Sequence, residues 1–173
     1  MEQPLGFNFR ELSHEKLIKY AEFLLRQYRL VDAHWFLKVE DNFGLDLASK
    51  FNEEIWAKLG EISAKDIIRY IGVEKGELKS VLEALKYFPW TIIASWKITE
   101  FSDKRAVILA ERCPPQESRL KSGRKIFACK AMQQSFFENF VKIFNSSIKV
   151  RCHNAPPDPK PQGYWCKWEL ILE

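Results

Sequence analysis

The first half of the chain carries apolar residues at the three- and four-residue spacing that marks one face of an amphipathic helix. Ser13 is a candidate N-cap for the first such segment, because its hydroxyl can accept a hydrogen bond from the first helical turn. The pattern predicts five helices in this half, at about residues 13–28, 32–44, 47–60, 63–71 and 75–87.

At Pro89 the period changes from 3.6 residues to two. Apolar and polar side chains alternate over residues 90–98, which predicts a half-buried strand, and a second strand is expected at 104–112. A loop rich in proline and charge, CPPQESRLKSGRK, follows. A helix at about 124–144 and strands at 148–153 and 164–172 end the chain.

Short connections between neighbouring strands favour antiparallel pairing. The predicted fold class is α+β, with an N-terminal helical half followed by a ββαββ antiparallel sheet that a helix covers. We expect a single domain over residues 1–173, made of a helical subdomain at 1–88 and a sheet-plus-helix subdomain at 89–173.

Composition and charge narrow the class of protein. Hydrophobic residues make up 46% and aromatic residues 14% of the 173 positions, which is typical of a globular chain. The net charge of +4, from 27 basic and 23 acidic residues, is too small and dispersed to indicate nucleic acid or an anionic membrane. The longest uncharged apolar stretch, residues 87–96, is half the length of about 20 residues that a membrane span needs. We therefore predict a soluble, cytoplasmic protein.

The four cysteines are the clearest candidates for a site: Cys113, Cys129, Cys152 and Cys166. Alternation places Cys152 on the apolar face of its strand and Cys166 on the apolar face of the last strand, together with Trp168. If the two strands form a hairpin centred on Pro159, antiparallel register sets Cys152 opposite Cys166.

The other two cysteines are placed by a helix face and by a turn. Cys129 lies in the first turns of the helix at 124–144, on the face that would cover the sheet. A tight turn at residues 102–103 would put Cys113 and Glu111 on the same side as the apolar face of 90–98, and a loop of odd length would reverse this. With the tight turn, all four cysteines converge on the core side and Glu111 lies beside them.

Three interpretations of the cysteines remain open. They are packing residues, or ligands of zinc or an iron–sulfur cluster, or they include a reactive thiol. The intervals of 15, 22 and 13 residues between them contain no CxxC pair, so only the fold could assemble a metal site. Cys129 is the candidate nucleophile, with Glu111 as a possible base, because no histidine is clearly placed to serve Cys129.

Basic residues before the last helix suggest a ligand site. Arg119 and Arg124 lie in the stretch RLKSGRK, where the N–H groups of the following helix could help to hold a carboxylate or phosphate. Lys130 and Trp168 complete the predicted ligand-binding set. The alternative is a solvated charged loop.

Several motifs carry a family resemblance from about Leu30 to the end of the chain. They are W-F-x-x-V-E-x-x-F-G near residue 35, F-x-C-K at 127–130, A-P-P-D at 155–158 and C-K-W-E at 166–169. The chain resembles an uncharacterised family of cytosolic proteins from archaea and anaerobic bacteria. It is more distantly similar to L-2-amino-thiazoline-4-carboxylic acid hydrolases and to vinyl-reductase-type ligand-binding domains. That similarity implies a small-molecule pocket, although Asn52 stands where the pattern has an aspartate.

Three functional hypotheses follow. The first is a cytosolic domain that binds a small ligand or a metal at a four-cysteine pocket between the last helix and the sheet. The second is a hydrolase of a small cyclic acid, which would use a metal-activated water or Cys129. The third is a structural or subunit-assembly protein that forms homo-oligomers, in which the cysteines only pack and exposed apolar patches serve dimerisation.

Overall fold

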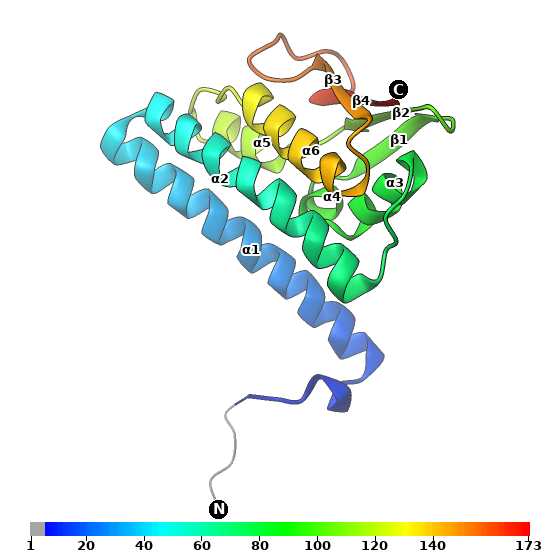
Figure 1. The fold of residues 1–173 in the computed structure, drawn as a ribbon. Coiled ribbons are helices and arrows are strands. Elements are labelled where there is room, and N and C mark those ends of the chain that lie inside the picture. Colours follow the sequence, from blue (N-terminus) through cyan, green and yellow to red (C-terminus); the bar gives the residue numbers. More distant parts are fainter. Residues whose placement is uncertain (1–5) are drawn as a thin grey trace, which may run out of the picture. The chain divides into compact units, whose positions relative to one another are not determined.

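The computed structural model describes residues 6–173 and divides into two compact units, one ending at Trp35 and the other formed by Phe36–Glu173. The elements, in order, are the 3-10 turn η1 (Phe9–Glu11), α1 (His14–Phe43), α2 (Leu45–Asp66), the π-helical turn η2 (Ile67–Ile71), α3 (Leu78–Tyr87), α4 (Pro89–Ile93), β1 (Trp96–Phe101), β2 (Arg105–Ala110), α5 (Pro114–Lys121), α6 (Lys130–Phe144), β3 (Ile148–Asn154) and β4 (Cys166–Leu172). Figure 1 shows their arrangement.

The first unit is an aromatic N-terminal segment followed by most of α1. Ser13 caps α1 as predicted, because its hydroxyl accepts a hydrogen bond from the Lys16 N–H at 3.3 Å. The rings of Phe7 and Phe9 lie 5.0 and 5.7 Å from the ring of Tyr20. No residue of α1 is buried in the structure.

Two boundaries in the helical half differ from the prediction. The segments at 13–28 and 32–44 are one continuous helix, α1, since residues 29–31 (Arg-Leu-Val) include no helix breaker. The end at Gly44 is confirmed, and this glycine has a φ of 89°. The predicted end at Gly60 is wrong, because α2 continues through it to Asp66.

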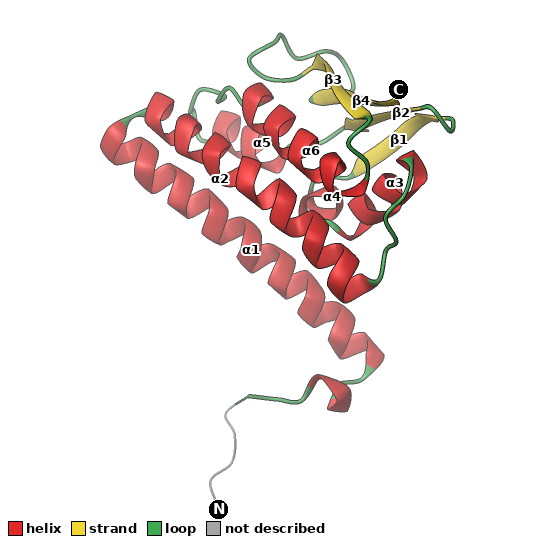
Figure 2. Cartoon of the chain, in the orientation of Figure 1, coloured by secondary structure: helices red, strands yellow, loops and turns green. Residues whose placement is uncertain are grey.

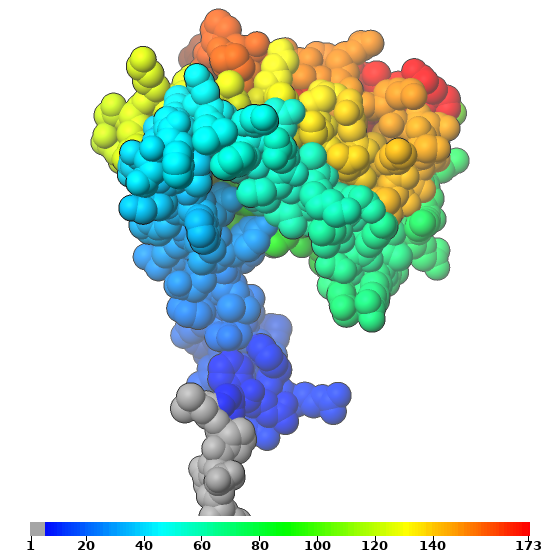
Figure 3. Space-filling view, turned by 60° about the vertical axis from the view of Figure 1, so that its left-hand side comes forward, coloured from blue at the N-terminus to red at the C-terminus, as the bar shows by residue number. Residues whose placement is uncertain are grey.

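Gly60 stays helical because α2 and α6 approach closely there. A Cβ at residue 60 would lie 2.4 Å from the Phe136 carbonyl oxygen, so only glycine fits. One turn away, the Asn139 side-chain amide donates to the Ala57 carbonyl at 3.1 Å. The surfaces of α2 and α6 meet along their length in the space-filling view (Figure 3).

The sheet is antiparallel throughout, with the strand order β1-β2-β4-β3. The helix α6 covers one face, which we call the core face of the sheet (Figures 1 and 2). On this face the Phe137 ring lies 5.6 Å from Trp96 and 5.5 Å from Trp168. The α+β class is confirmed.

The detailed ββαββ order is not reproduced, because two short helices were missed. Residues 89–93 form α4 with Pro89 in its first turn, and β1 begins only after Ser95, whose φ is 52°. The predicted loop at 113–125 contains α5, which starts at two prolines and in which Glu117 accepts the Cys113 N–H at 3.0 Å. The last helix begins at Lys130 rather than near Arg124.

Candidate functional site

The two strand cysteines lie on the core face but are not partners. Cys152 is opposite Trp168, and Cys166 is opposite Ala110 of β2. The predicted pairing of Cys152 with Cys166 is therefore wrong by two residues along the strand. A shift of two keeps every side chain on its face, so both cysteines still pack against the hydrophobic core.

The orientation of β2 is the reverse of the one that the tight turn predicted. Ala106 and Ile108 belong to the core cluster on the α6 side, and Val107 is on the opposite, outer face of the sheet. Glu111 follows with the outer-face residues and forms an exposed ion pair of 2.7 Å with Lys97. The structure therefore does not place Glu111 beside the thiols.

Cys113 and Cys129 occupy equivalent positions, each preceding a helix. Cys113 is the N-cap residue of α5, and Cys129 is the N-cap residue of α6. Cys113 approaches the other thiols because the chain turns into α5 after β2. All four cysteines are free thiols, and we call them the thiol cluster.

The thiols of this cluster are close enough to affect one another's ionisation. Burial raises the pKa of Cys166, and neighbouring Cys113, Cys129 and Cys152 raise it further, while the Trp168 indole N–H partly opposes the increase. Burial raises the pKa of Cys113 to about 12 and that of Cys129 to about 11. The pKa of Cys152 is also raised by burial, against the effect of Lys130. Each of these shifts favours the neutral thiol.

A buried glutamine connects two parts of the cluster. The Gln116 amide donates to the Phe127 carbonyl at 2.8 Å and accepts the Phe127 N–H at 3.2 Å. The same amide nitrogen lies 3.6 Å from the Cys129 sulfur. These contacts hold the segment before α6 against α5.

A metal site at the four cysteines would need ligand atoms that converge on one point, because zinc and iron–sulfur clusters bind several thiolates at once. Within residues 6–173, no group of three or more histidine, cysteine, aspartate or glutamate side chains is arranged to hold a metal ion.

Arg119, a predicted ligand anchor, is buried and has protein partners. Its guanidinium binds Glu40 through two hydrogen bonds of 2.5 and 2.9 Å, and its Nε donates to the Lys125 carbonyl at 2.6 Å. It lies over the rings of Phe36 and Phe127, 5.5 and 5.7 Å from their centres. The Arg119 hydrogen bond holds the pKa of Glu40 below its usual value.

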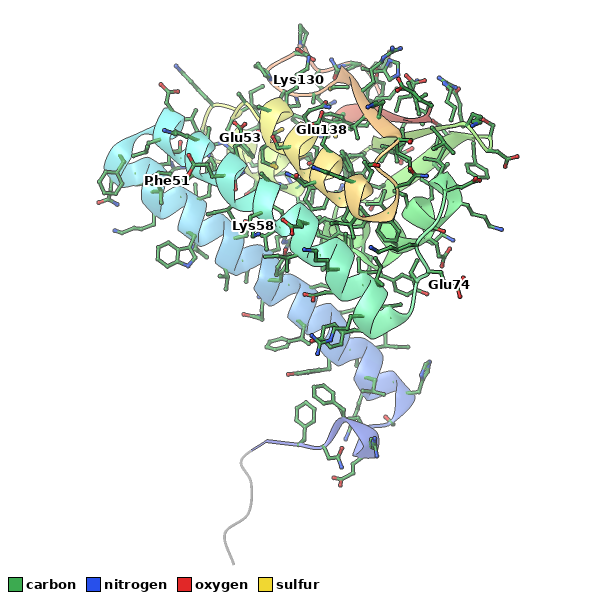
Figure 4. The ribbon with its side chains drawn as sticks, in the orientation of Figure 1. Phe51, Glu53, Lys58, Glu74, Lys130 and Glu138 are labelled. Atoms are coloured by element: carbon green, nitrogen blue, oxygen red, sulfur yellow. The ribbon has the colours of Figure 1, made fainter. Side chains whose placement is uncertain are left out.

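The other predicted anchors also have internal roles. Arg124 forms an ion pair with Asp41 at 2.8 Å, and Trp168 is completely buried in the core. Lys130, at the start of α6, binds Asp158 at 2.8 Å; its label in Figure 4 marks this end of the helix.

Two of the motifs contact each other directly. The Pro156 carbonyl accepts the backbone N–H groups of Cys129 and Lys130 at 3.0 and 2.9 Å, and the Pro156-Pro157 peptide is cis. Asp158 accepts the Ala155 N–H at 3.2 Å. The A-P-P-D and F-x-C-K motifs thus form one hydrogen-bonded unit at the start of α6. The Pro156 carbonyl accepts hydrogen bonds from the first N–H groups of this helix.

Sequence reasoning missed a polar cluster on the outer face of the sheet. Glu169 is buried there and binds Arg105, His153 at 3.1 Å and Arg151 at 3.7 Å. Burial alone would raise the pKa of Glu169, but Arg105 and His153 outweigh burial, so its pKa is lowered. Alternation did place Glu169 and His153 away from the cysteines, but nothing in the pattern indicated that this carboxylate is buried.

The fold and the thiol cluster define an α+β domain with neutral cysteines packed beside its core. The chain belongs to a family of unknown function, DUF6125, whose model matches residues 10–172. This confirms membership in an uncharacterised family, whereas the hydrolase resemblance stays a prediction. No curated protein matches the chain in sequence.

The fold is similar to that of a solved structure. A crystal structure of a trafficking protein particle complex subunit 3 from Naegleria fowleri, covalently bound to palmitic acid, matches with a TM-score of 0.55 and 11% identity. The match covers 88% of this chain and 96% of that chain. Within residues 6–173, no helix has the length and apolar character needed to cross a membrane.

Proposed function

We propose that this protein is an assembly subunit, which associates with another folded chain through an exposed apolar helix surface. The observation that carries the proposal is α1, a helix of 30 residues with no buried side chain. Those of its large apolar residues that are exposed have exposed fractions from 37% at Leu17 to 69% at Trp35, while others, such as Leu25 and Leu30, are part-buried. Extended apolar surfaces of this kind mark protein–protein contacts in soluble proteins.

The similar solved structure supports this proposal at the level of fold. That protein is named as a subunit of a trafficking particle complex, and the match extends over nearly its whole length. The same architecture can therefore serve as one component of a multi-protein assembly.

The state of the predicted site supports the same function. The cysteine thiols are protonated and packed, and Arg119 and Arg124 have carboxylate partners within the chain. These groups hold the second unit together.

The test is the mass of the full chain in solution. Sedimentation velocity and light scattering over a hundredfold range of concentration should give an oligomer of the 20.4 kDa chain that dissociates on dilution. A constant mass of 20.4 kDa over the whole range would contradict the proposal.

A second candidate retains the ligand predicted at the thiol cluster. The observation that favours it is the gathering of four thiols beside an apolar core, in a fold whose solved example carries palmitic acid covalently. The ligand would be a long-chain acyl group, attached when a cysteine sulfur attacks an acyl thioester and the donor thiol leaves.

Cys152 is the candidate acceptor, because Lys130 partly offsets the burial that raises the pKa of its thiol. Incubation with palmitoyl-coenzyme A should add one acyl group, which neutral hydroxylamine removes and Cys152→Ser prevents. Acylation that is unchanged in Cys152→Ser, or absent in the wild type, would contradict this candidate.

A further inference from the structure

The exposed apolar residues of α1 follow a coiled-coil pattern. Residues spaced alternately by four and three along the helix are Leu17, Ala21, Leu24, Tyr28, Val31 and Trp35, and all six are exposed. We call this set the α1 seam. The pattern repeats every seven residues with two seam positions in each repeat, which keeps a stripe on one side of the helix. This spacing is the one with which a helix packs against another α-helix.

The residues beside the seam permit a second copy of the same helix. The six flanking positions are Ile18, Tyr20, Leu25, Gln27, Asp32 and His34. Only Asp32 among them is a formally charged residue. The other six charged residues between positions 15 and 35 lie on the far side of the helix. Two copies can thus approach without bringing rows of like charges together.

We propose that the α1 seam pairs with the α1 seam of a second copy of this chain, forming a symmetric homodimer. The inference rests on the proposed function, since it names the partner of an assembly surface. With a two-fold axis, the same surface of each copy forms the interface, and the assembly is complete with two chains.

The sizes of the seam residues set the direction of pairing as antiparallel. With the axis near residue 26, Leu17 faces Trp35, Ala21 faces Val31, and Leu24 faces Tyr28 of the second copy. Each layer then combines a smaller and a larger side chain. A parallel pair would place two tryptophans together in one layer and two alanines in another. The tryptophan layer would be overpacked, and the alanine layer would contain a cavity.

The first experiment measures dissociation of the full-length dimer by sedimentation. Val31→Glu and Leu24→Glu put a charge into the seam and should weaken dimerisation at least tenfold, while circular dichroism confirms that each variant remains helical. Leu120→Glu is the matched control, because Leu120 is similarly exposed, at 55%, but lies on α5. It should dimerise like the wild type.

Disulfide trapping gives a second readout that does not depend on destabilising the helix. In the antiparallel pair, position 27 of each copy lies beside the axis, so Gln27→Cys should cross-link to itself under mild oxidation. Trp35→Cys should not, because the two ends of the seam are about 27 Å apart at 1.5 Å per residue. The wild type, with its four native cysteines, controls for background.

The outcomes separate this inference from the proposed function. A wild-type dimer that persists unchanged in Val31→Glu and Leu24→Glu would overturn the seam and leave the assembly function standing. Self-cross-linking of Trp35→Cys in place of Gln27→Cys would overturn the antiparallel arrangement. A wild type that is monomeric at every concentration would overturn both.

Discussion

The Glu40 carboxylate near the end of α1 forms two hydrogen bonds with the guanidinium of Arg119 on α5, at 2.5 and 2.9 Å. The two residues are 79 positions apart in the sequence. Both side chains are largely removed from water, with 5% of Arg119 and 14% of Glu40 exposed. The pair attaches the last turns of α1 to α5 within the second unit, and its aromatic surroundings limit the access of water.

Glu40→Gln should therefore destabilise the protein. Removing one charge of a buried pair leaves Arg119 uncompensated, which costs about 3–5 kcal/mol in comparable cases. The free energy of unfolding in urea would measure the loss. Glu61→Gln, which alters an exposed pair with Lys65 on α2, should change stability little. Equal effects of the two substitutions would contradict the role of the buried pair.

The same pair should make stability depend on pH in the acid range. Arg119 lowers the pKa of Glu40 in the folded state from an ordinary value of 4.5. The pair's contribution is thus complete above about pH 4.5 and is lost as the pH falls through the folded pKa. Urea unfolding between pH 3 and pH 6 should show a smaller loss for Glu40→Gln than for the wild type. A parallel decline in both proteins would assign the acid sensitivity to other groups.

Gly60→Ala should be destabilising although alanine favours helices. The new methyl group would lie 2.4 Å from the Phe136 carbonyl oxygen, so α2 and α6 must move apart. We expect a loss of about 1–3 kcal/mol, as for other overpacked sites. Glu54→Ala, on an exposed position of the same helix, is the control and should be neutral or slightly stabilising. Thermal unfolding of the three proteins makes the comparison.

The part-buried cysteines should react slowly with iodoacetamide in the folded protein. Burial raises the pKa of Cys129 to about 11, and each pH unit below that value lowers the thiolate fraction about tenfold. Peptide mapping after timed labelling should show the rate at Cys129 rising about tenfold per unit from pH 7.5 to 9.5. Urea-unfolded protein should label rapidly at all four cysteines. Equal rates in the folded and unfolded states would show that the thiol is not protected.

Stability should also fall at high pH because of the same thiols. Their folded pKa values lie above the ordinary value of 9.0, so unfolding releases protons once the pH passes about 9. The stability present below that pH is lost as the pH rises towards the folded values. Cys166→Ala should cost about 1 kcal/mol at pH 7 through lost packing and should flatten this decline. An unchanged slope in Cys166→Ala would contradict the ionisation argument.

The sequence by itself determined the features that arise from local periodicity. The helical first half, the cap at Ser13, the end of α1 at Gly44 and the three strands β2, β3 and β4 follow from patterns within a few residues. The faces of Cys152 and Cys166 also follow, because alternation is a property of one strand alone. The coiled-coil spacing of α1 can also be read from the sequence, whereas the exposure of its side chains depends on the folded structure.

Only the tertiary structure decided the features that depend on distant segments. Gly60 lies inside α2 and does not end it. The Phe136 backbone, 76 positions later in the sequence, approaches so closely that residue 60 has no room for a side chain. The orientation of β2 relative to β1 depends on a β-bulge in β1 between Ile98 and Glu100, and this bulge reversed the face of Glu111. Arg119 and Arg124 form ion pairs with Glu40 and Asp41, carboxylates that only the folded chain brings near them. Short helices that begin at prolines, such as α4 and α5, are stabilised by packing and capping contacts, and these contacts exist only in the folded chain.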